Sequence, residues 1–286
     1  MLKNTFLHVP RIGEKTEERL WRHGFLSWQD FIDGCNSCPI PTLTPGTVVN
    51  HLEESIRALA CQNARYFEER LHASDAWRFY ADFRHTTAFV DIETTGLYSG
   101  TDSITVIGLY DGHSTTVFIQ GKNLEEFRDE VKKYSLLVTF NGKRFDLPFI
   151  RSVFGDLPPL QGHIDLLYPL RKFGYRGGLK SIEHQLGLER EGSLKKADGY
   201  LAVLLWREYK KGNKAALDTL VRYNLEDVVN MQYLADWVYN EGVSRLLIPL
   251  EMLPVPSKYN VDVPFDEELV EYLSQTIEEQ RADRTY

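Results

Sequence analysis

The sequence is short of cysteine, of long apolar runs and of positive charge. Three cysteines in 286 residues are too few for a disulfide framework, so a small disulfide-stabilised secreted fold is excluded. No apolar run approaches the ~20 residues that a membrane-spanning helix needs, and the first residues lack the apolar stretch of a secretory signal. The hydrophobic fraction of 43% is sufficient for a core. We therefore expect a cytoplasmic protein that makes no membrane contact.

Three short, widely separated segments contain four carboxylates, namely Asp91, Glu93, Asp146 and Asp227. Carboxylate oxygens are the ligands that Mg²⁺ and Mn²⁺ prefer. Two such ions about 3.5–4 Å apart stabilise the attacking and the leaving oxygen of an in-line phosphoryl displacement, so the pattern predicts a two-metal nuclease. The three segments are Asp-Ile-Glu-Thr-Thr-Gly at 91–96, Phe-Asn-Gly-Lys-Arg-Phe-Asp at 140–146 and Tyr-Asn-Leu-Glu-Asp at 223–227.

Apolar, β-branched runs lead into the first two segments and predict strands. The first three runs are separated by turn residues and predict an antiparallel meander, and the fourth predicts a central strand that is buried on both faces. Because alternate residues of a strand face the same side, Asp91 and Glu93 should project together. Asp146 should follow the end of the fourth strand. The runs occupy 87–90, 104–110, 115–119 and 136–140.

The third segment lies within a run of apolar residues at helical spacing, which predicts a helix over 214–239. Tyr223 and Asp227 are four residues apart and therefore lie on the same face of that helix. A strand, a strand end and a helix can thus bring the four carboxylates and the tyrosine to one metal cluster.

In their order and their residues, the three segments resemble the Exo I, Exo II and Exo III motifs of the DEDD exonuclease superfamily. They are similar to the proofreading domains of B-family DNA polymerases and to bacterial YprB-like nucleases, which share Asp-Ile-Glu-Thr, Asn-Gly-x-x-Phe-Asp and Tyr-x-x-x-Asp. The DEDDh subtype has a histidine five residues before the last aspartate, but here that residue is Arg222. Tyr223, four residues before, resembles the DEDDy subtype. The resemblance covers about residues 85–240.

The resemblance implies an α/β fold of the ribonuclease H type, in which a mixed sheet is flanked by helices. It implies that the four carboxylates hold two Mg²⁺ or Mn²⁺ ions and that Tyr223 orients the attacking water. Phosphodiester bonds would be hydrolysed at nucleic-acid ends in the 3′ to 5′ direction. Single-stranded or frayed 3′ ends are the expected substrate, whereas the choice between DNA and RNA is left open.

Other interpretations remain open at this point. A single Asp-x-Glu is usually a solvated strand end, and a single Tyr-x-x-x-Asp is usually part of a helix surface. A chain with this fold can also be a pseudoenzyme or a non-catalytic scaffold that binds nucleic acid. An endonuclease of the same fold is a further alternative. Metal dependence and the loss of activity in Asp91→Ala would exclude a scaffold, and circular substrates would identify an endonuclease.

The net charge of −8 is unevenly distributed along the chain. Residues 171–214 contain eleven basic and five acidic residues, whereas residues 241–286 contain four basic and ten acidic residues. The basic segment either contacts backbone phosphates or forms a solvated face. The candidate nucleic-acid contacts in and near the motifs are Thr94, Asn141, Lys143, Arg144 and Lys180.

A helical module is expected over residues 1–75, because residues 7–31 resemble a helix-hairpin-helix element, in which backbone N–H groups at a helix start bind a phosphate. Arg11, Gly13 and Lys15 are its candidate nucleic-acid contacts. Arg11 stands where the family usually has glycine, so the hairpin either contacts phosphate through this charge or is purely structural. The aromatic residues of this segment are expected to form the core of the module. They are Trp21, Phe25, Trp28 and Phe31.

Further helices are expected after the hairpin and between the second and third motifs. Asp165 and His184 should lie near the cleft, where a structural hydrogen bond is expected of each. Residues 241–286 form a proline-containing acidic extension whose end, from 266 to about 281, should be helical. This extension can pack on the nuclease domain at 85–240, cover the cleft or bind a partner. The further helices are expected over 45–71, 149–154, 164–170 and 179–187.

The three cysteines are Cys35, Cys38 and Cys61, and His51 stands between them in the sequence. Such residues are the ingredients of a zinc site, but one Cys-x-x-Cys pair is a weak signal. Free thiols are the simpler expectation for a cytoplasmic protein.

Overall fold

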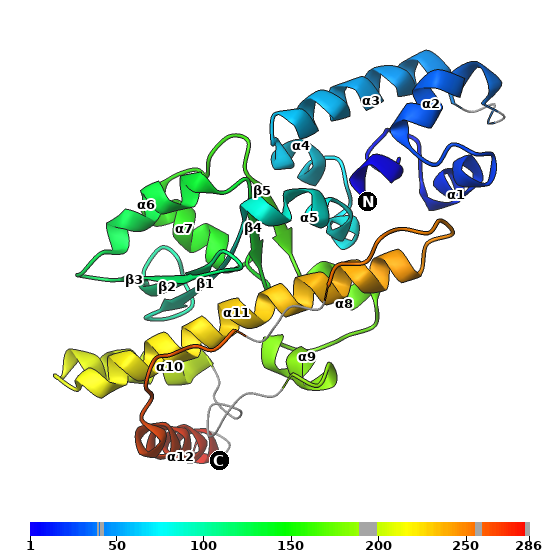
Figure 1. The fold of residues 1–286 in the computed structure, drawn as a ribbon. Coiled ribbons are helices and arrows are strands. Elements are labelled where there is room, and N and C mark those ends of the chain that lie inside the picture. The colour runs from blue at the N-terminus through cyan, green and yellow to red at the C-terminus, as the bar shows by residue number, and fades with distance from the viewer. Residues whose placement is uncertain (39, 41–42, 189–198, 255–258, 284–286) are drawn as a thin grey trace.

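The fold is described from a computed structural model, which defines residues 1–38, 40, 43–188, 199–254 and 259–283 (Figure 1). A five-stranded sheet lies at its centre in the order β3-β2-β1-β4-β5. β1 pairs antiparallel with β2, and β2 with β3, whereas β1–β4 and β4–β5 are parallel pairs. The expected meander and the mixed sheet are confirmed. The strands are β1 (Thr87–Thr94), β2 (Ile104–Tyr110), β3 (Thr115–Ile119), β4 (Leu136–Thr139) and β5 (Gly162–Asp165).

The fifth strand corrects the expectation of a helix over 164–170. β5 is hydrogen-bonded to β4 as far as Asp165, and α8 (Leu167–Lys172) begins two residues later. Four residues are too few for a periodic pattern to show, and their strand conformation depends on pairing with a distant segment. Gly162 is needed there because a Cβ atom would lie 2.7 Å from the carbonyl carbon of Ala64.

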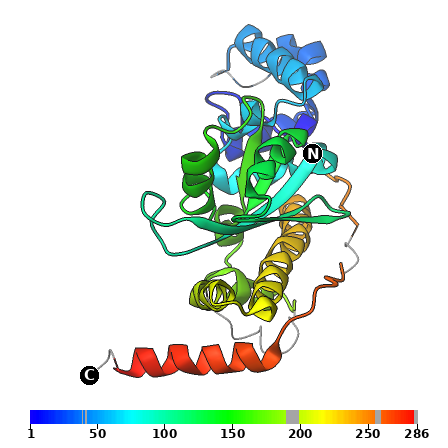
Figure 2. The ribbon, with the colours of Figure 1, turned by 90° about the vertical axis from the view of Figure 1, so that its left-hand side faces the viewer.

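Alternation along β1 separates two faces of the sheet. On one face Ala88, Val90 and Ile92 pack with side chains of α6 (Phe127–Glu130) and α7 (Asp146–Phe154). On the other face the long helix α11 (Lys214–Ser244) crosses β1 and β2. Figure 2 shows α11 on one side of the sheet and the green helices α6 and α7 on the other. Residues 91 and 93 of β1 therefore face α11.

The N-terminal part is helical, as expected, and its aromatic side chains are buried. Trp21, Phe25, Trp28 and Phe31 are between 0% and 6% exposed, so their role as core residues is confirmed. Trp28 stacks on Phe67 with ring centroids 6.2 Å apart. The helices of this part are α1 (Glu14–Arg22), α2 (Trp28–Gly34), α3 (Pro45–Ala60), α4 (Ala64–Glu68) and α5 (Trp77–Phe83).

The helix expected over 45–71 is two helices. α3 begins at Pro45, with Thr44 as its N-cap, as the sequence indicated. It ends at Ala60 because Gln62 adopts a φ of +53°, which a helix cannot contain. α4 then turns so that Ala64 approaches β5. Single turns of 3₁₀ helix occupy Leu2–Asn4, Cys35–Ser37, Ala73–Asp75, Arg84–Thr86, Leu124–Glu126 and Val131–Lys133.

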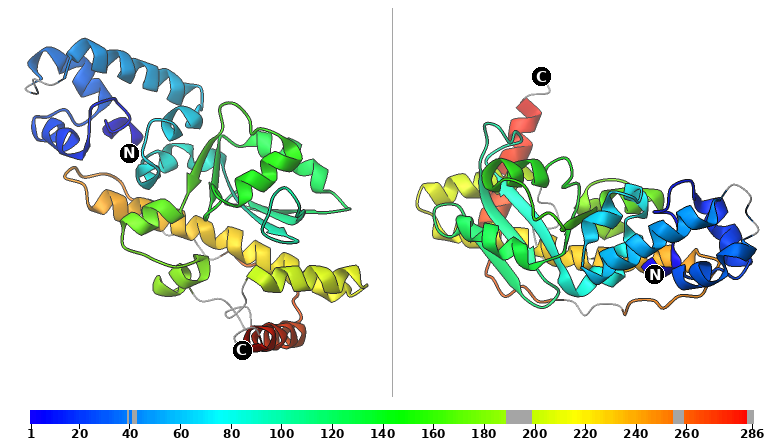
Figure 3. Two further views of the ribbon diagram at one scale, coloured as in Figure 1. Left: turned by 180° about the vertical axis from the view of Figure 1, so that it is seen from behind. Right: turned by 90° about the horizontal axis from the view of Figure 1, so that it is seen from above.

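The C-terminal extension returns along α11 toward the other end of the molecule, as Figure 3 shows from behind and from above. The side-chain amide of Asn240 donates to the carbonyl of Leu253, and the backbone N–H of Leu253 donates to Asn240. The extension ends in α12 (Glu267–Asp283), which packs on α10 (Gly199–Lys210). Of the three arrangements considered, the described residues show packing on the part of the chain that contains the sheet, through α10 and α11.

One apolar cluster contains both the aromatic core of the N-terminal helices and side chains of α11 and of the sheet. A division at 1–75, 85–240 and 241–286 remains a proposal, because this cluster is continuous between the first two parts. Among the described helices, none has the length and apolar character needed to traverse a bilayer.

Candidate active site

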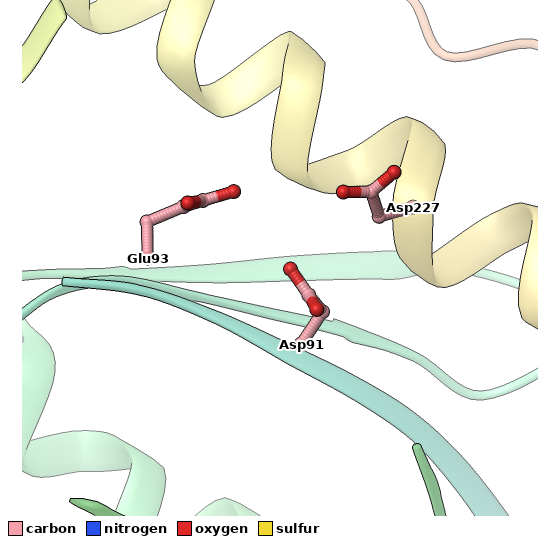
Figure 4. Close-up of side chains that lie close together, drawn as sticks. All are labelled: Asp91, Glu93 and Asp227. Carbon is pink, nitrogen blue, oxygen red and sulfur yellow. The ribbon is translucent and has the colours of Figure 1, made fainter. Parts of the chain in front are cut away.

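Three carboxylates meet between the sheet and α11. Asp91 and Glu93 project from β1 toward the helix, and Asp227 projects from α11 toward the strand (Figure 4). One oxygen from each lies within 4.8 Å of the others. Both Glu93 and Asp227 are 7% exposed. The alternation of β1 and the phase of α11 therefore produce the convergence that the sequence predicted.

Asp146 stands at the start of α7 and lies beside this group of three. Its Oδ1 accepts a hydrogen bond from the backbone N–H of Ile92 at 3.2 Å, which ties α7 to β1. Asp146 is 3% exposed and lines the same cavity as the other carboxylates. Its role as a metal ligand remains a proposal, since the group of three defined above does not include it.

Burial and like charge raise the pKa values of Glu93 and Asp146. The pKa of Glu93 is well above its ordinary value, first because of burial and then because of the negative charge of Asp227, while Lys180 acts in the opposite direction. Burial also raises the pKa of Asp146 to about 7. Carboxylates crowded in this way are stabilised in their charged form by a bound cation, which the donor set of oxygens suits.

The carboxylates line a cavity of about 640 Å³. α10 also lines it, with Tyr200, Val203 and Arg207 at the spacing of one helix face. None of these three was predicted as a site residue, although Arg207 belongs to the basic segment and the three-and-four spacing could have pointed to the other two. The remaining lining residues are Asp91–Leu97, Phe140, Asn141, Phe145, Asp146, Gly199, Tyr223 and Asp227.

Tyr223 is held by Lys180 of α9 (Leu179–Gln185). The Lys180 ammonium donates a hydrogen bond of 2.8 Å to the hydroxyl, and Nζ lies 4.0 Å from the centroid of the ring. A phenol hydroxyl can both accept and donate a hydrogen bond, and here it accepts from Lys180. The structure thus places Lys180 at the site, next to the tyrosine.

Arg222, which stands where the DEDDh subtype has histidine, is directed to the C-terminal extension. Its Nε donates to Glu226 at 2.8 Å, and its terminal nitrogen donates to the carbonyls of Val261 and Val263. This residue therefore joins α11 to the extension.

The loop that carries the Exo II motif is held by Asp165. The carboxylate accepts backbone N–H groups of Asn141 at 2.7 Å, Lys143 at 3.1 Å and Leu167 at 3.1 Å. Asn141 has a φ of +62°, a conformation that Asn tolerates better than most residues. The expectation of a structural hydrogen-bonding role for Asp165 is confirmed.

The other predicted contacts are distributed over several places. Thr94 and Asn141 line the cavity, whereas Lys143 and Arg144 are exposed outside its lining. Arg11, Gly13 and Lys15 are exposed in the N-terminal part, also outside the lining. His184 is exposed on α9.

The hairpin turn before α1 keeps the conformation that glycine usually provides. Arg11 has a φ of +69°, in the left-handed region that costs a non-glycine residue roughly 1–2 kcal/mol. Gly13 is the N-cap of α1, and a Cβ atom there would meet nothing within 4 Å.

The three cysteines are free thiols, as expected, and the ligand groups found among the described residues include none of them.

The sheet order, the helix across its face and the buried carboxylates define a nuclease fold of the ribonuclease H type. The chain belongs to the RNase_H superfamily, which matches residues 88–239. YprB of Bacillus subtilis (strain 168), described as uncharacterized, is 30% identical over 165 residues, which are 50% of this chain and 39% of YprB. The chain thus spans about two fifths of the length of that relative.

Solved structures with a similar fold include a DNA polymerase and a protein named NrnC. The family B DNA polymerase of Pyrobaculum calidifontis is 18% identical, with a TM-score of 0.43 over 55% of this chain and 26% of the polymerase. NrnC of Brucella melitensis with bound Mg²⁺ is 21% identical, with a TM-score of 0.39 over 58% of this chain and 77% of NrnC.

Proposed function

We propose that the protein is a DEDDy-type 3′–5′ exonuclease that hydrolyses phosphodiester bonds at nucleic-acid ends with two divalent metal ions. The convergence of Asp91, Glu93 and Asp227 in a cavity that is also lined by Tyr223 carries this proposal. The superfamily match supports the nuclease class, and the tyrosine supports the subtype.

The donor set fits Mg²⁺ or Mn²⁺, because every candidate ligand is a carboxylate, and burial followed by the negative charge of Asp227 raises the pKa of Glu93. Asp91, Glu93, Asp146 and Asp227 would hold the ions. When bound, such ions stabilise developing negative charge and lower the pKa of a coordinated water molecule.

The chain's own residues would then position the substrate and the water. Lys180 fixes the Tyr223 hydroxyl as its hydrogen-bond acceptor, and the hydroxyl proton can be donated to the attacking water or to a phosphate oxygen. The aromatic rings of Phe140 and Tyr200 offer stacking surfaces for the terminal base, and Arg207 offers a charge for a phosphate. An end of a single strand fits such a lined cavity better than a continuous duplex.

The remaining proposed contacts extend this surface. Thr94 and Asn141 would contact the terminal nucleotide, since they line the cavity. Lys143 and Arg144 would contact backbone phosphates outside it. The helix-hairpin-helix-like element, with Arg11, Gly13 and Lys15, would bind a more distant phosphate, because the strained φ of Arg11 preserves the hairpin turn. We expect the enzyme to act in the cytoplasm.

The test is a gel time course with 5′-labelled single-stranded DNA and RNA oligonucleotides in Mg²⁺, Mn²⁺ or EDTA. We expect a ladder that shortens from the 3′ end with either metal and is absent in EDTA and in Asp91→Ala. Asp129→Ala is the matched control, because this carboxylate lies on α6 and its side chain is 85% exposed. It should cleave as the wild type does.

Two outcomes would contradict the proposal. Intact oligonucleotides in all lanes, with a retained gel shift, would indicate a non-catalytic scaffold. Cleavage of a circular single strand would indicate an endonuclease, because a circle offers no end.

A further inference from the structure

Asn224 is a buried residue of α11 that lies among the carboxylates without being one. It is 0% exposed. Its side-chain N–H₂ group donates to Oδ2 of Asp91 at 2.8 Å and to the backbone carbonyl of Asp91 at 3.2 Å. One amide group therefore contacts both the carboxylate and the backbone carbonyl of Asp91.

Gly108 provides the space that Asn224 occupies. It lies on β2 directly opposite Asp91 in the antiparallel register. A Cβ atom at this position would overlap Oδ1 of Asn224 and would lie 3.1 Å from its Cγ. The φ of Gly108 is not positive, so its backbone conformation does not require glycine. The close approach of the Asn224 side chain explains the glycine instead.

The two acceptor groups of Asp91 determine the orientation of the Asn224 amide. In the opposite orientation its oxygen would face two acceptor groups, whereas the observed one directs the donors to them. Its Oδ1 is then buried without a hydrogen-bond partner among the described residues. A buried unsatisfied acceptor costs roughly 1–3 kcal/mol, so folding stability alone does not account for this arrangement.

We propose that Asn224 is a positioning residue that orients the Asp91 carboxylate for metal binding, and that Gly108 is required to admit it. The inference rests on the proposed function, because it concerns the same site. A hydrogen bond to Oδ2 of Asp91 fixes the rotation of this carboxylate beside Glu93 and Asp227. Groups that orient metal ligands in this way typically change metal affinity or activity by about 10–100-fold when removed.

The test compares Mn²⁺ binding by calorimetry, melting without metal, and kcat/KM on a labelled oligonucleotide. Asn224→Leu is the main variant, because leucine has the same branching at Cγ and removes both the donor and the unsatisfied oxygen. We expect Mn²⁺ affinity to fall about 10–100-fold, with kcat/KM lowered and melting without metal retained. If leucine at position 224 prevents folding, Asn224→Ala should give the same loss of Mn²⁺ affinity and of kcat/KM.

Gly108→Ala should weaken Mn²⁺ binding in the same direction, because the new methyl group displaces Asn224. In the double variant Gly108→Ala/Asn224→Ala the effects should not add, since both substitutions remove one contact. The matched control is Asn240→Ala, which removes two hydrogen bonds from the same helix at a distance from the site. It should bind Mn²⁺ as the wild type does.

Different results would contradict the proposed function and the positioning role of Asn224. A wild-type protein that neither binds Mn²⁺ nor cleaves would contradict the proposed function itself. Normal Mn²⁺ affinity in a folded Asn224→Leu or Asn224→Ala, beside an active wild type, would overturn the positioning role alone. Additive losses in the double variant would overturn the link between Gly108 and Asn224.

Discussion

This molecule contains two buried clusters of charged side chains, one with charges of the same sign and one with charges of opposite sign. At the cavity, Asp91, Glu93 and Asp227 bring like charges together. Between α1 and α5, Glu17 and Arg78 form a buried ion pair of 3.0 Å. In the first cluster each carboxylate destabilises its neighbours, whereas in the second each charge has an opposite charge beside it.

The second cluster continues to the nuclease part through Lys172 of α8, which contacts Asp75 at 2.8 Å and Glu14 at 2.6 Å. Glu17 also accepts hydrogen bonds from the hydroxyl of Thr5 and the backbone N–H of Phe6, both at 2.6 Å. Burial still raises the pKa of Glu17, so the pair offsets only part of the lost hydration.

The comparison separates a structural use of buried charge from a functional one. An alternating network satisfies its own members and holds two parts of the chain together. A cluster of one sign has no such benefit within the protein, and it persists in a stable fold where an external cation completes it. Substitutions in the two clusters should therefore have opposite consequences.

The largest effect is expected for Asp227→Asn in the acidic cluster. Turnover should fall by about 10³-fold or more, because the two-metal arrangement loses a ligand. The melting temperature without metal should be equal or higher, since a repulsive charge is removed. Oligonucleotide cleavage and thermal melting in EDTA measure the two quantities. An Asp227→Asn variant that melts at a lower temperature than the wild type and still cleaves would contradict the predicted difference between the two clusters.

The next effect is expected for Arg78→Met in the alternating cluster. Glu17 would be left buried and unpaired, which should lower the free energy of unfolding by roughly 3–5 kcal/mol. Cleavage by the folded variant should be unchanged. Arg22→Met is the matched control, because Arg22 pairs with Glu18 at the surface, where the two side chains are 63% and 44% exposed. Urea denaturation should show a change of at most about 0.5 kcal/mol for this control; equal losses in both variants would contradict the prediction.

The sequence could predict those parts of the site that depend on local periodicity. Asp91 and Glu93 are two apart on a strand, and Tyr223 and Asp227 are four apart on a helix, so their common directions follow from backbone geometry. The apolar runs around them identified four of the five strands. The order of the motifs then supplied the family and, with it, the expectation that these elements meet.

The rest depends on contacts between distant segments, which leave no local pattern. Gly108 and Asn224 are ordinary residues until β2 and α11 are placed against each other. β5 is too short to be recognised without its partner β4. Lys180 appeared as one of many basic residues, and only the packing of α9 shows that it reaches Tyr223. Tertiary contacts thus decide which polar residues near a motif belong to the site.

Within the acidic cluster, Tyr223→Phe should lower turnover by roughly 10²-fold and leave Mn²⁺ affinity unchanged. The substitution removes the hydroxyl that Lys180 holds, while the carboxylates keep their positions. Single-turnover cleavage and calorimetry separate the two quantities. The matched control is Tyr209→Phe, because Tyr209 lies on α10, where its ring is tilted against that of Trp206 with centroids 5.2 Å apart. Full turnover in Tyr223→Phe would exclude a role for the hydroxyl in orienting water.

The smallest effect concerns pH and a neutral group in the N-terminal part. His8 is 3% exposed, and burial, followed by the positive charges of Arg70 and His51, lowers its pKa to about 3. The unfolded chain binds this proton near pH 6.5. Between these values the unfolded state therefore holds one more proton, and the contribution of His8 to stability falls by up to about 1.4 kcal/mol per pH unit as the pH decreases.

Asp146 has the opposite shift, with a pKa of about 7 in the folded protein, so its protonation stabilises the fold as the pH falls through 7. The dependence of wild-type stability on pH contains the effects of both His8 and Asp146, and a substitution at His8 separates them.

His8→Gln should reduce the loss of stability between pH 6.5 and 4.5 by up to about 1.4 kcal/mol per pH unit, measured by urea denaturation in EDTA. His184→Gln removes an exposed imidazole and is the matched control. Parallel profiles for wild type and His8→Gln would mean that buried His8 takes up its proton as readily when folded, and the contrast between a neutral N-terminal core and a proton-binding acidic site would not hold.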